Sequence, residues 1–164
     1  MSRLVKIGLI AVLTAGILTG ITYAATRPIP ENQPQTALQN TSATQLPGDA
    51  KAFEQALQPQ ASFKYKILVV DTTDGEDRTD YLDRVAASWA QPEADTLLLV
   101  LFREHNWDIR FYMGATFRQH NVTVAEMLGL VRETYLPKAR VGNPAGGLAD
   151  YLTAVNKRMG GGPV

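Results

Sequence analysis

The chain contains no cysteine and only two histidines among its 164 residues. Without cysteine it can form no disulfide, no thiol nucleophile, no cysteine-based zinc site and no lipidated N-terminal cysteine. The two histidines, His105 and His120, are too few for a multi-histidine metal centre. Sixteen basic side chains balance sixteen acidic ones, so the formal net charge is zero. A general nucleic-acid binder needs a positive footprint, and we therefore expect no nucleic-acid partner.

The usual sequence motifs of catalysis are also missing. The chain has no G-x-S-x-G elbow, no P-loop, no G-x-G-x-x-G after a predicted strand and no H-E-x-x-H. The sequence therefore contains none of the motifs that usually indicate a classical hydrolase or a nucleotide-binding protein. The sequence favours a non-enzymatic role and leaves enzymatic activity open.

The N-terminus is strongly apolar. Residues 7–25 carry no charge and follow Arg3 and Lys6. As a helix, this run would extend about 28 Å, close to the roughly 30 Å of a bilayer core. We predict that residues 1–25 are a transmembrane anchor or uncleaved signal, with the N-terminus inside and the domain outside the cell membrane. The alternative is a signal cleaved after residues 22–24, which would release a secreted protein.

Residues 26–48 are rich in Pro, Gln, Asn, Thr and Ser and contain few large apolar side chains. Such a composition buries too little surface to offset the entropy lost on ordering. The sequence therefore predicts a disordered linker over 26–48. One α/β domain follows over 49–160, and residues 161–164 form a tail.

Three runs of the domain are typical of strands. Residues 66–70 and 96–102 are continuous apolar runs, as in strands that are buried on both faces. Residues 78–90 lie between them and have helical spacing, which predicts a β-α-β unit with parallel strands. Residues 108–113 alternate in polarity, and the short connection predicts an antiparallel, more exposed third strand. Arg110 and Tyr112 share the exposed face of that strand, which is either an ordinary solvated face or part of a partner surface.

Three more helices are expected. A helix over 49–58 is capped by Asp49. A second helix begins at Thr123 and ends at Pro137, and its predicted core stripe comprises Val124, Met127, Leu128, Val131 and Tyr135. Asn143 caps the last helix. The order α-β-α-β-β-α-α predicts an α/β, three-layer-like sandwich with a small mixed sheet, preceded by the transmembrane helix.

Acidic residues concentrate in the turn after the first predicted strand, where six of the sixteen acids fall within residues 71–83. Ligand sites of α/β sheets gather at the carboxyl ends of parallel strands, and Glu104 and His105 would be neighbours there. Clustered carboxylates suit Ca²⁺ or Mg²⁺, so Asp71, Asp74 and Asp77 are the candidate metal ligands. The alternative is that Asp77 caps the following helix and that the turn binds no ion.

The order of these features resembles the TPM domain, a family named after a thylakoid-lumen protein, a photosystem II repair protein and a nematode receptor modulator. The resemblance lies in KILVVDT, the acidic turn before a helix that ends at Trp89, TLLLVLF, DIRFYMG and YLPKARVGNPAGGLADYL. It implies an α/β sandwich outside the cytoplasm. It also implies roles spread over phosphatase activity, photosystem repair and regulation of membrane complexes, with divalent cations bound by acidic loops in some members.

Three candidate functions follow from these features. The first is a membrane-anchored, extracytoplasmic accessory module that binds a membrane protein complex in its assembly, repair or modulation. The alternative is a metal-assisted phosphatase that uses Asp71, Asp74 and Asp77 to hold a cation. A third possibility is a domain that binds its partner in response to Ca²⁺.

Overall fold

A computed structural model describes residues 27–33, 37–42, 45–57, 63–89 and 95–160. The predicted membrane segment (1–25) and the predicted tail (161–164) lie outside the described residues. Within the described ranges, no helix is both long enough and apolar enough to cross a membrane.

A four-stranded mixed sheet forms the centre of the α/β domain. Its strands lie side by side in chain order, as β1 (Leu38–Asn40), β2 (Lys64–Val70), β3 (Thr96–Phe102) and β4 (Asp108–Met113). β1, β2 and β3 are parallel, and β4 runs antiparallel to β3. The predicted mixed sheet is confirmed, with β1 as a strand that the sequence did not predict.

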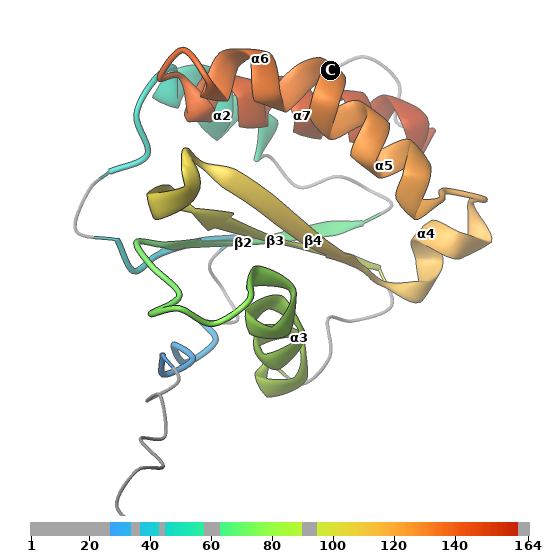
Figure 1. Ribbon diagram of the computed structural model, residues 1–164. Helices are drawn as coiled ribbons and strands as arrows, with labels where there is room; N and C mark the ends of the chain where they lie inside the picture. Colours follow the sequence, from blue (N-terminus) through green and yellow to red (C-terminus); the bar gives the residue numbers. More distant parts are fainter. Residues whose placement is uncertain (1–26, 34–36, 43–44, 58–62, 90–94, 161–164) are drawn as a thin grey trace, which may run out of the picture.

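Helices cover both faces of the sheet, so the domain has three layers (Figure 1). Helix α3 (Arg78–Ser88) covers one face, as the one helix of the described residues on that side. The opposite face carries α2 (Ala50–Ala56), α5 (Val124–Leu130), η2 (Val131–Tyr135), α6 (Leu136–Ala139) and α7 (Pro144–Arg158). Two short helices serve as connections, η1 (Arg103–His105) before β4 and α4 (Ala115–Gln119) after it.

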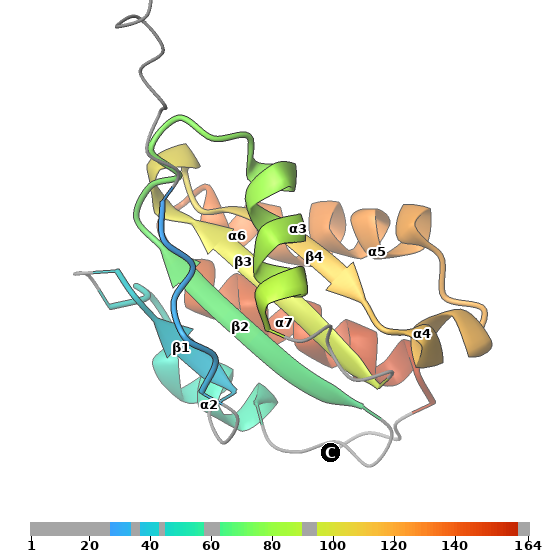
Figure 2. The same ribbon diagram turned by 90° about the horizontal axis from the view of Figure 1, so that it is seen from below.

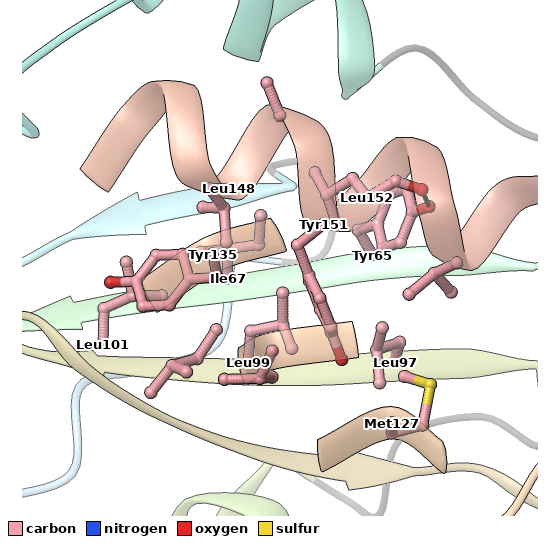
Figure 3. Packing of buried hydrophobic residues seen from close by; sticks show 14 of the residues in the cluster. Tyr65, Ile67, Leu97, Leu99, Leu101, Met127, Tyr135, Leu148, Tyr151 and Leu152 are labelled. Atoms are coloured by element: carbon pink, nitrogen blue, oxygen red, sulfur yellow. Dashed lines mark hydrogen bonds between the residues drawn. The ribbon is translucent and has the colours of Figure 1, made fainter. Parts of the chain in front are cut away.

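Strand β3 is buried along its whole length and divides the core into two parts. Leu97, Leu99 and Leu101 pack toward α7, as Figure 3 shows. Leu98 and Val100 pack toward α3 on the other face. This arrangement explains why β3 is apolar from Leu97 to Phe102, because each of its faces is covered by helices.

The structure differs from the predicted disordered linker over 26–48. Residues 38–40 of this segment form β1, and Ile29 packs against the cluster between α3 and the sheet. The Trp89 indole N–H donates to the carbonyl of Pro30 at 2.8 Å. The contacts of the described residues in this segment come from β2 and α3, so its own composition could not reveal them.

The predicted end of the helix at Pro137 is also wrong. The chain continues from α5 through η2 to Ala139, with Pro137 in the first turn of α6. The Leu136 N–H donates to the carbonyl of Val131, five residues back, as in a π-helix. This wider turn takes in a proline that would otherwise break the helical hydrogen-bond pattern.

Candidate functional site

The acidic turn lies where the sequence placed it, at the carboxyl ends of β2 and β3. These strands are paired in parallel through Val70 and Phe102, so the residues that follow them emerge at the same edge. The Glu104 N–H donates to the carbonyl of Asp71 at 3.0 Å. The backbone thus brings Asp71 and Glu104 together as expected.

The Asp71 carboxylate has partners of its own. It accepts a hydrogen bond from the Ser42 hydroxyl at 2.6 Å and forms an ion pair with Arg103 at 3.1 Å. Ser42 belongs to the segment after β1, which the sequence predicted as linker. The charge of Asp71 is therefore balanced by an arginine that follows β3.

Asp74 and Asp77 hold the shape of the turn. Asp74 is exposed and lies in the left-handed region at φ 55°, and its N–H donates to the Thr72 hydroxyl at 2.9 Å. Asp77 is the N-cap of α3 and accepts from the Thr79 N–H at 2.7 Å. This backbone hydrogen bond lowers the pKa of Asp77, although desolvation opposes it. The capping alternative for Asp77 is confirmed.

The side chain of Glu104, in η1, contacts the acidic turn. Desolvation opposes ionisation of Glu104, but hydrogen bonds from Thr72 and Thr73 and the charge of His105 lower its pKa overall. Its carboxylate accepts from the Thr73 N–H at 2.7 Å and lies 3.2 Å from the His105 ring nitrogen. The side chain of His105 thus meets the turn through Glu104.

The three candidate ligands occupy different positions in the turn. Among the described residues, no group of three or more histidine, aspartate or glutamate side chains is arranged to hold a metal ion. A cation at Asp71 would have to compete with Arg103 for its carboxylate. The metal assignment to Asp71, Asp74 and Asp77 stays a prediction.

An apolar groove of about 690 Å³ lies along the free edge of the sheet. Figures 1 and 2 show β4 at this edge, with α3 on one face of the sheet and α5 on the other. The residues that line it come from α3, β4 and the segment from α4 to α5, and they are Thr79, Leu82, Ile109, Arg110, Phe111, Tyr112, Met113, Arg118, Asn121, Val122, Thr123, Val124 and Leu128. We call this feature the β4 groove.

The α5 side of the β4 groove exposes two large apolar side chains. Val124 is 56% exposed and Leu128 is 41% exposed. The sequence placed both on the core stripe, but only Met127, Val131 and Tyr135 of that stripe are buried. The apolar stripe of the sequence is wider than the face that α5 buries in the core. Its two extra residues, Val124 and Leu128, were the sequence feature that could have indicated a surface site.

The β4 groove is cationic as well as apolar. It contains Arg110 and Arg118, whereas no aspartate or glutamate lines it in the described part of the chain. Asp108, at the start of β4, pairs with both Arg78 and Arg110 at 2.7 Å, so the two arginines share one carboxylate. The candidate partner surface predicted around Arg110 and Tyr112 is thus part of a larger concave site.

Solved structures that resemble the chain include two bacterial N-terminal domains. The N-terminal domain of a protein from P. gingivalis has 18% sequence identity and a TM-score of 0.63, covering 76% of this chain and 82% of that one. The N-terminal domain of a protein from Corynebacterium glutamicum has 13% identity and a TM-score of 0.59, covering 85% of this chain and 90% of that one. At these identities the likeness shows a shared fold only.

No curated protein matches the chain. The TPM domain family matches residues 32–158, most of the sequence and nearly all of the described domain. The match begins ahead of β1, in agreement with the role of that strand in the sheet. The chain therefore belongs to the TPM domain family.

Proposed function

We propose that this protein is a membrane-anchored, extracytoplasmic accessory module that binds a membrane protein complex. In this proposal residues 7–25 cross the membrane, and the α/β domain presents the β4 groove to the partner. The observation that carries the proposal is the groove itself, an open apolar concavity in which Val124 and Leu128 are exposed to solvent. Exposed apolar patches of this kind mark binding surfaces in otherwise polar protein exteriors.

Co-purification of the intact protein from detergent extracts tests the binding role. The informative variant is Leu128→Glu, because it places a charge in the β4 groove at a side chain that is already 41% exposed. Val141→Glu is the matched control, since Val141 is 80% exposed and lies outside the groove. We expect a reproducible membrane protein partner with the natural chain and with Val141→Glu, and its loss with Leu128→Glu. Equal recovery with both variants would argue against the groove.

The proposed location is tested by chemical labelling, because the chain has no cysteine of its own. A single Val141→Cys substitution would introduce a thiol at an exposed turn. In intact cells a membrane-impermeant maleimide is expected to label this thiol if the domain lies outside the cytoplasmic membrane. The mass of the labelled chain then distinguishes a retained anchor from a cleaved signal and a secreted product.

A second candidate is a metal-assisted phosphatase, and one observation favours it. Asp71 and Glu104 emerge side by side at the carboxyl ends of parallel strands, a common place for ligand sites. Ca²⁺ or Mg²⁺ held by Asp71, Asp74 and Asp77 would polarise a phosphoryl oxygen and activate water. Divalent-dependent hydrolysis of a phosphoester, lost in Asp71→Ala and Asp74→Ala, is the expected result. Thermal unfolding unchanged by millimolar Ca²⁺ or Mg²⁺ would count against it.

A further inference from the structure

The backbone of β4 has hydrogen-bonding groups that point away from the sheet. The Gly114 N–H donates to the carbonyl of Thr96 at 2.9 Å, which sets the phase of the antiparallel pairing. In such a pair, every second residue directs both its N–H and its carbonyl away from the neighbouring strand. For β4 these residues are Ile109, Phe111 and Met113. No other strand in the described ranges pairs with β4 on that side.

This edge lacks most of the features that protect edge strands from pairing. Natural edges are shortened, bulged or blocked by proline, lysine or a covering segment. β4 is six residues long, contains neither proline nor lysine and pairs with β3 without a break in register. The outward carbonyl of Ile109 accepts a hydrogen bond of 3.0 Å from the Arg110 guanidinium. Within the described ranges, no hydrogen bond covers the outward backbone groups of Phe111 and Met113.

The β4 groove surrounds this open edge on both faces. Phe111 and Met113 lie on the same face as α5, together with Val124 and Leu128 of the groove. Tyr112 packs toward the α3 side. An extended chain beside β4 would therefore meet apolar side chains above and below its backbone. At about 3.4 Å per residue, the six residues of β4 match a partner segment of about six residues.

The charges favour an acidic partner over a second copy of this chain. Arg110 shares the Asp108 carboxylate with Arg78, so its charge is only partly neutralised near the start of β4. Arg118 is exposed and has no ion-pair partner within the described part of the chain. Two copies paired through β4 would bring these arginines together, whereas an acidic peptide would neutralise them.

We propose that the β4 groove binds an extended, acidic peptide segment of the partner protein, which pairs with β4 as a fifth strand. This proposal rests on the accessory function given above and names the chemistry of its partner. Backbone hydrogen bonds to Phe111 and Met113 supply affinity, as in other cases of strand addition. Alternate apolar side chains of the peptide enter the groove, and its carboxylates face Arg110 and Arg118.

A fluorescent peptide of alternating valine and glutamate, VEVEVEV, is the probe, with the full chain held in detergent micelles. The peptide is expected to bind, and its lysine counterpart VKVKVKV is expected not to. Two further versions carry N-methyl groups on all valine amides or on all glutamate amides. Strand addition uses only one of these sets, so one version is expected to lose binding and the other to keep it. Equal binding by both would overturn the proposal.

Charge reversal in the protein gives the matching test. Arg118→Glu is expected to weaken VEVEVEV binding by about tenfold or more and to improve binding of VKVKVKV. Arg140→Glu is the control, because Arg140 is exposed and lies outside the groove. If the two substitutions have the same effect, only general charge attraction is involved, and the site assignment is wrong.

Amide hydrogen exchange locates the contact. The amides of Phe111 and Met113 are expected to become protected when VEVEVEV binds, whereas the amide of Tyr112, which faces β3, is protected already. Protection that rises with protein concentration in the absence of peptide would identify a second copy and overturn the proposal. A membrane protein partner that is lost in Leu128→Glu, together with no binding of VEVEVEV, would rule out strand addition but leave the accessory function supported.

Discussion

Two buried tyrosines, Tyr65 of β2 and Tyr151 of α7, differ in what their hydroxyl groups contact. The Tyr65 hydroxyl donates to Asn156 Oδ1 and lies 3.2 Å from the carbonyl of Leu152. The Tyr151 hydroxyl is buried too, but it has no hydrogen-bond partner among the described residues. Figure 3 shows Tyr151 pointing from α7 toward β3. Desolvation raises the pKa of both phenols, so both stay neutral over the physiological range.

We predict opposite effects for the same substitution at these two positions. Tyr65→Phe leaves the buried Asn156 acceptor without its partner and should lower the free energy of unfolding by roughly 1–3 kcal/mol. Tyr151→Phe removes a hydroxyl group that is buried without compensation, so stability should be unchanged or higher by about 1 kcal/mol. Urea unfolding of both variants measures the difference. Equal losses of stability in the two variants would mean that the hydrogen bond between Tyr65 and Asn156 adds no more stability than an unpartnered hydroxyl does.

At the scale of single elements, the close approach of α7 to η2 depends on one glycine. A Cβ atom at Gly147 would lie 2.6 Å from the carbonyl oxygen of Tyr135, which no real structure tolerates without movement. Gly129, in α5, has open space around the same position. Both glycines lie in helices, so the backbone preference for alanine is the same at the two positions. The two positions differ only in how closely other atoms pack around them.

This contrast gives a matched pair of alanine substitutions. Gly147→Ala should destabilise the domain by about 1–3 kcal/mol, because a backbone carbonyl must shift. Gly129→Ala should stabilise it by about 0.5–1 kcal/mol, because alanine restricts the unfolded chain and favours the helix. Thermal unfolding of the two variants measures both changes. A stable Gly147→Ala protein would show that α7 and η2 can separate without cost.

Elements whose pattern is local were predictable from the sequence. The bounds of β3 and β4 agree with their runs of apolar and alternating residues, and Asp49, Asp77 and Asn143 cap their helices as expected. Elements that depend on distant partners were not predictable. The three residues of β1 carry no strand pattern of their own, and they are ordered by pairing with β2.

The same distinction applies to the candidate sites. The acidic turn is visible in the sequence as a concentration of charge, but its ion pair with Arg103 depends on how β2 and β3 pair. The β4 groove combines residues from three separate segments. Sequence periodicity assigned Val124 and Leu128 to the core, because an apolar stripe does not show which part of it meets another element.

At the scale of the whole molecule, residues 27–33, which follow the predicted membrane helix, form hydrogen bonds with α3 and Trp89. The Arg84 guanidinium donates to the carbonyl of Arg27 at 2.9 Å, and Trp89 donates to Pro30. Figure 2 shows residues 27–33, drawn in blue, on the same face of the sheet as α3. If residues 7–25 cross the membrane, little chain remains between the bilayer and this attachment. The α3 layer would then face the membrane.

This orientation predicts unequal distances from the bilayer for two matched labels. Ala87 in α3 and Ala125 in α5 are both exposed, and their helices lie on opposite faces of the sheet. In the cysteine-free chain, a fluorophore on Ala87→Cys should be quenched by lipid-attached spin labels more strongly than one on Ala125→Cys. The full chain in vesicles is the sample, and a chain that begins at residue 27 is the control, for which neither label should be quenched. Equal quenching in vesicles would mean that the domain tumbles freely, so the contacts of Arg27 and Pro30 would not orient it.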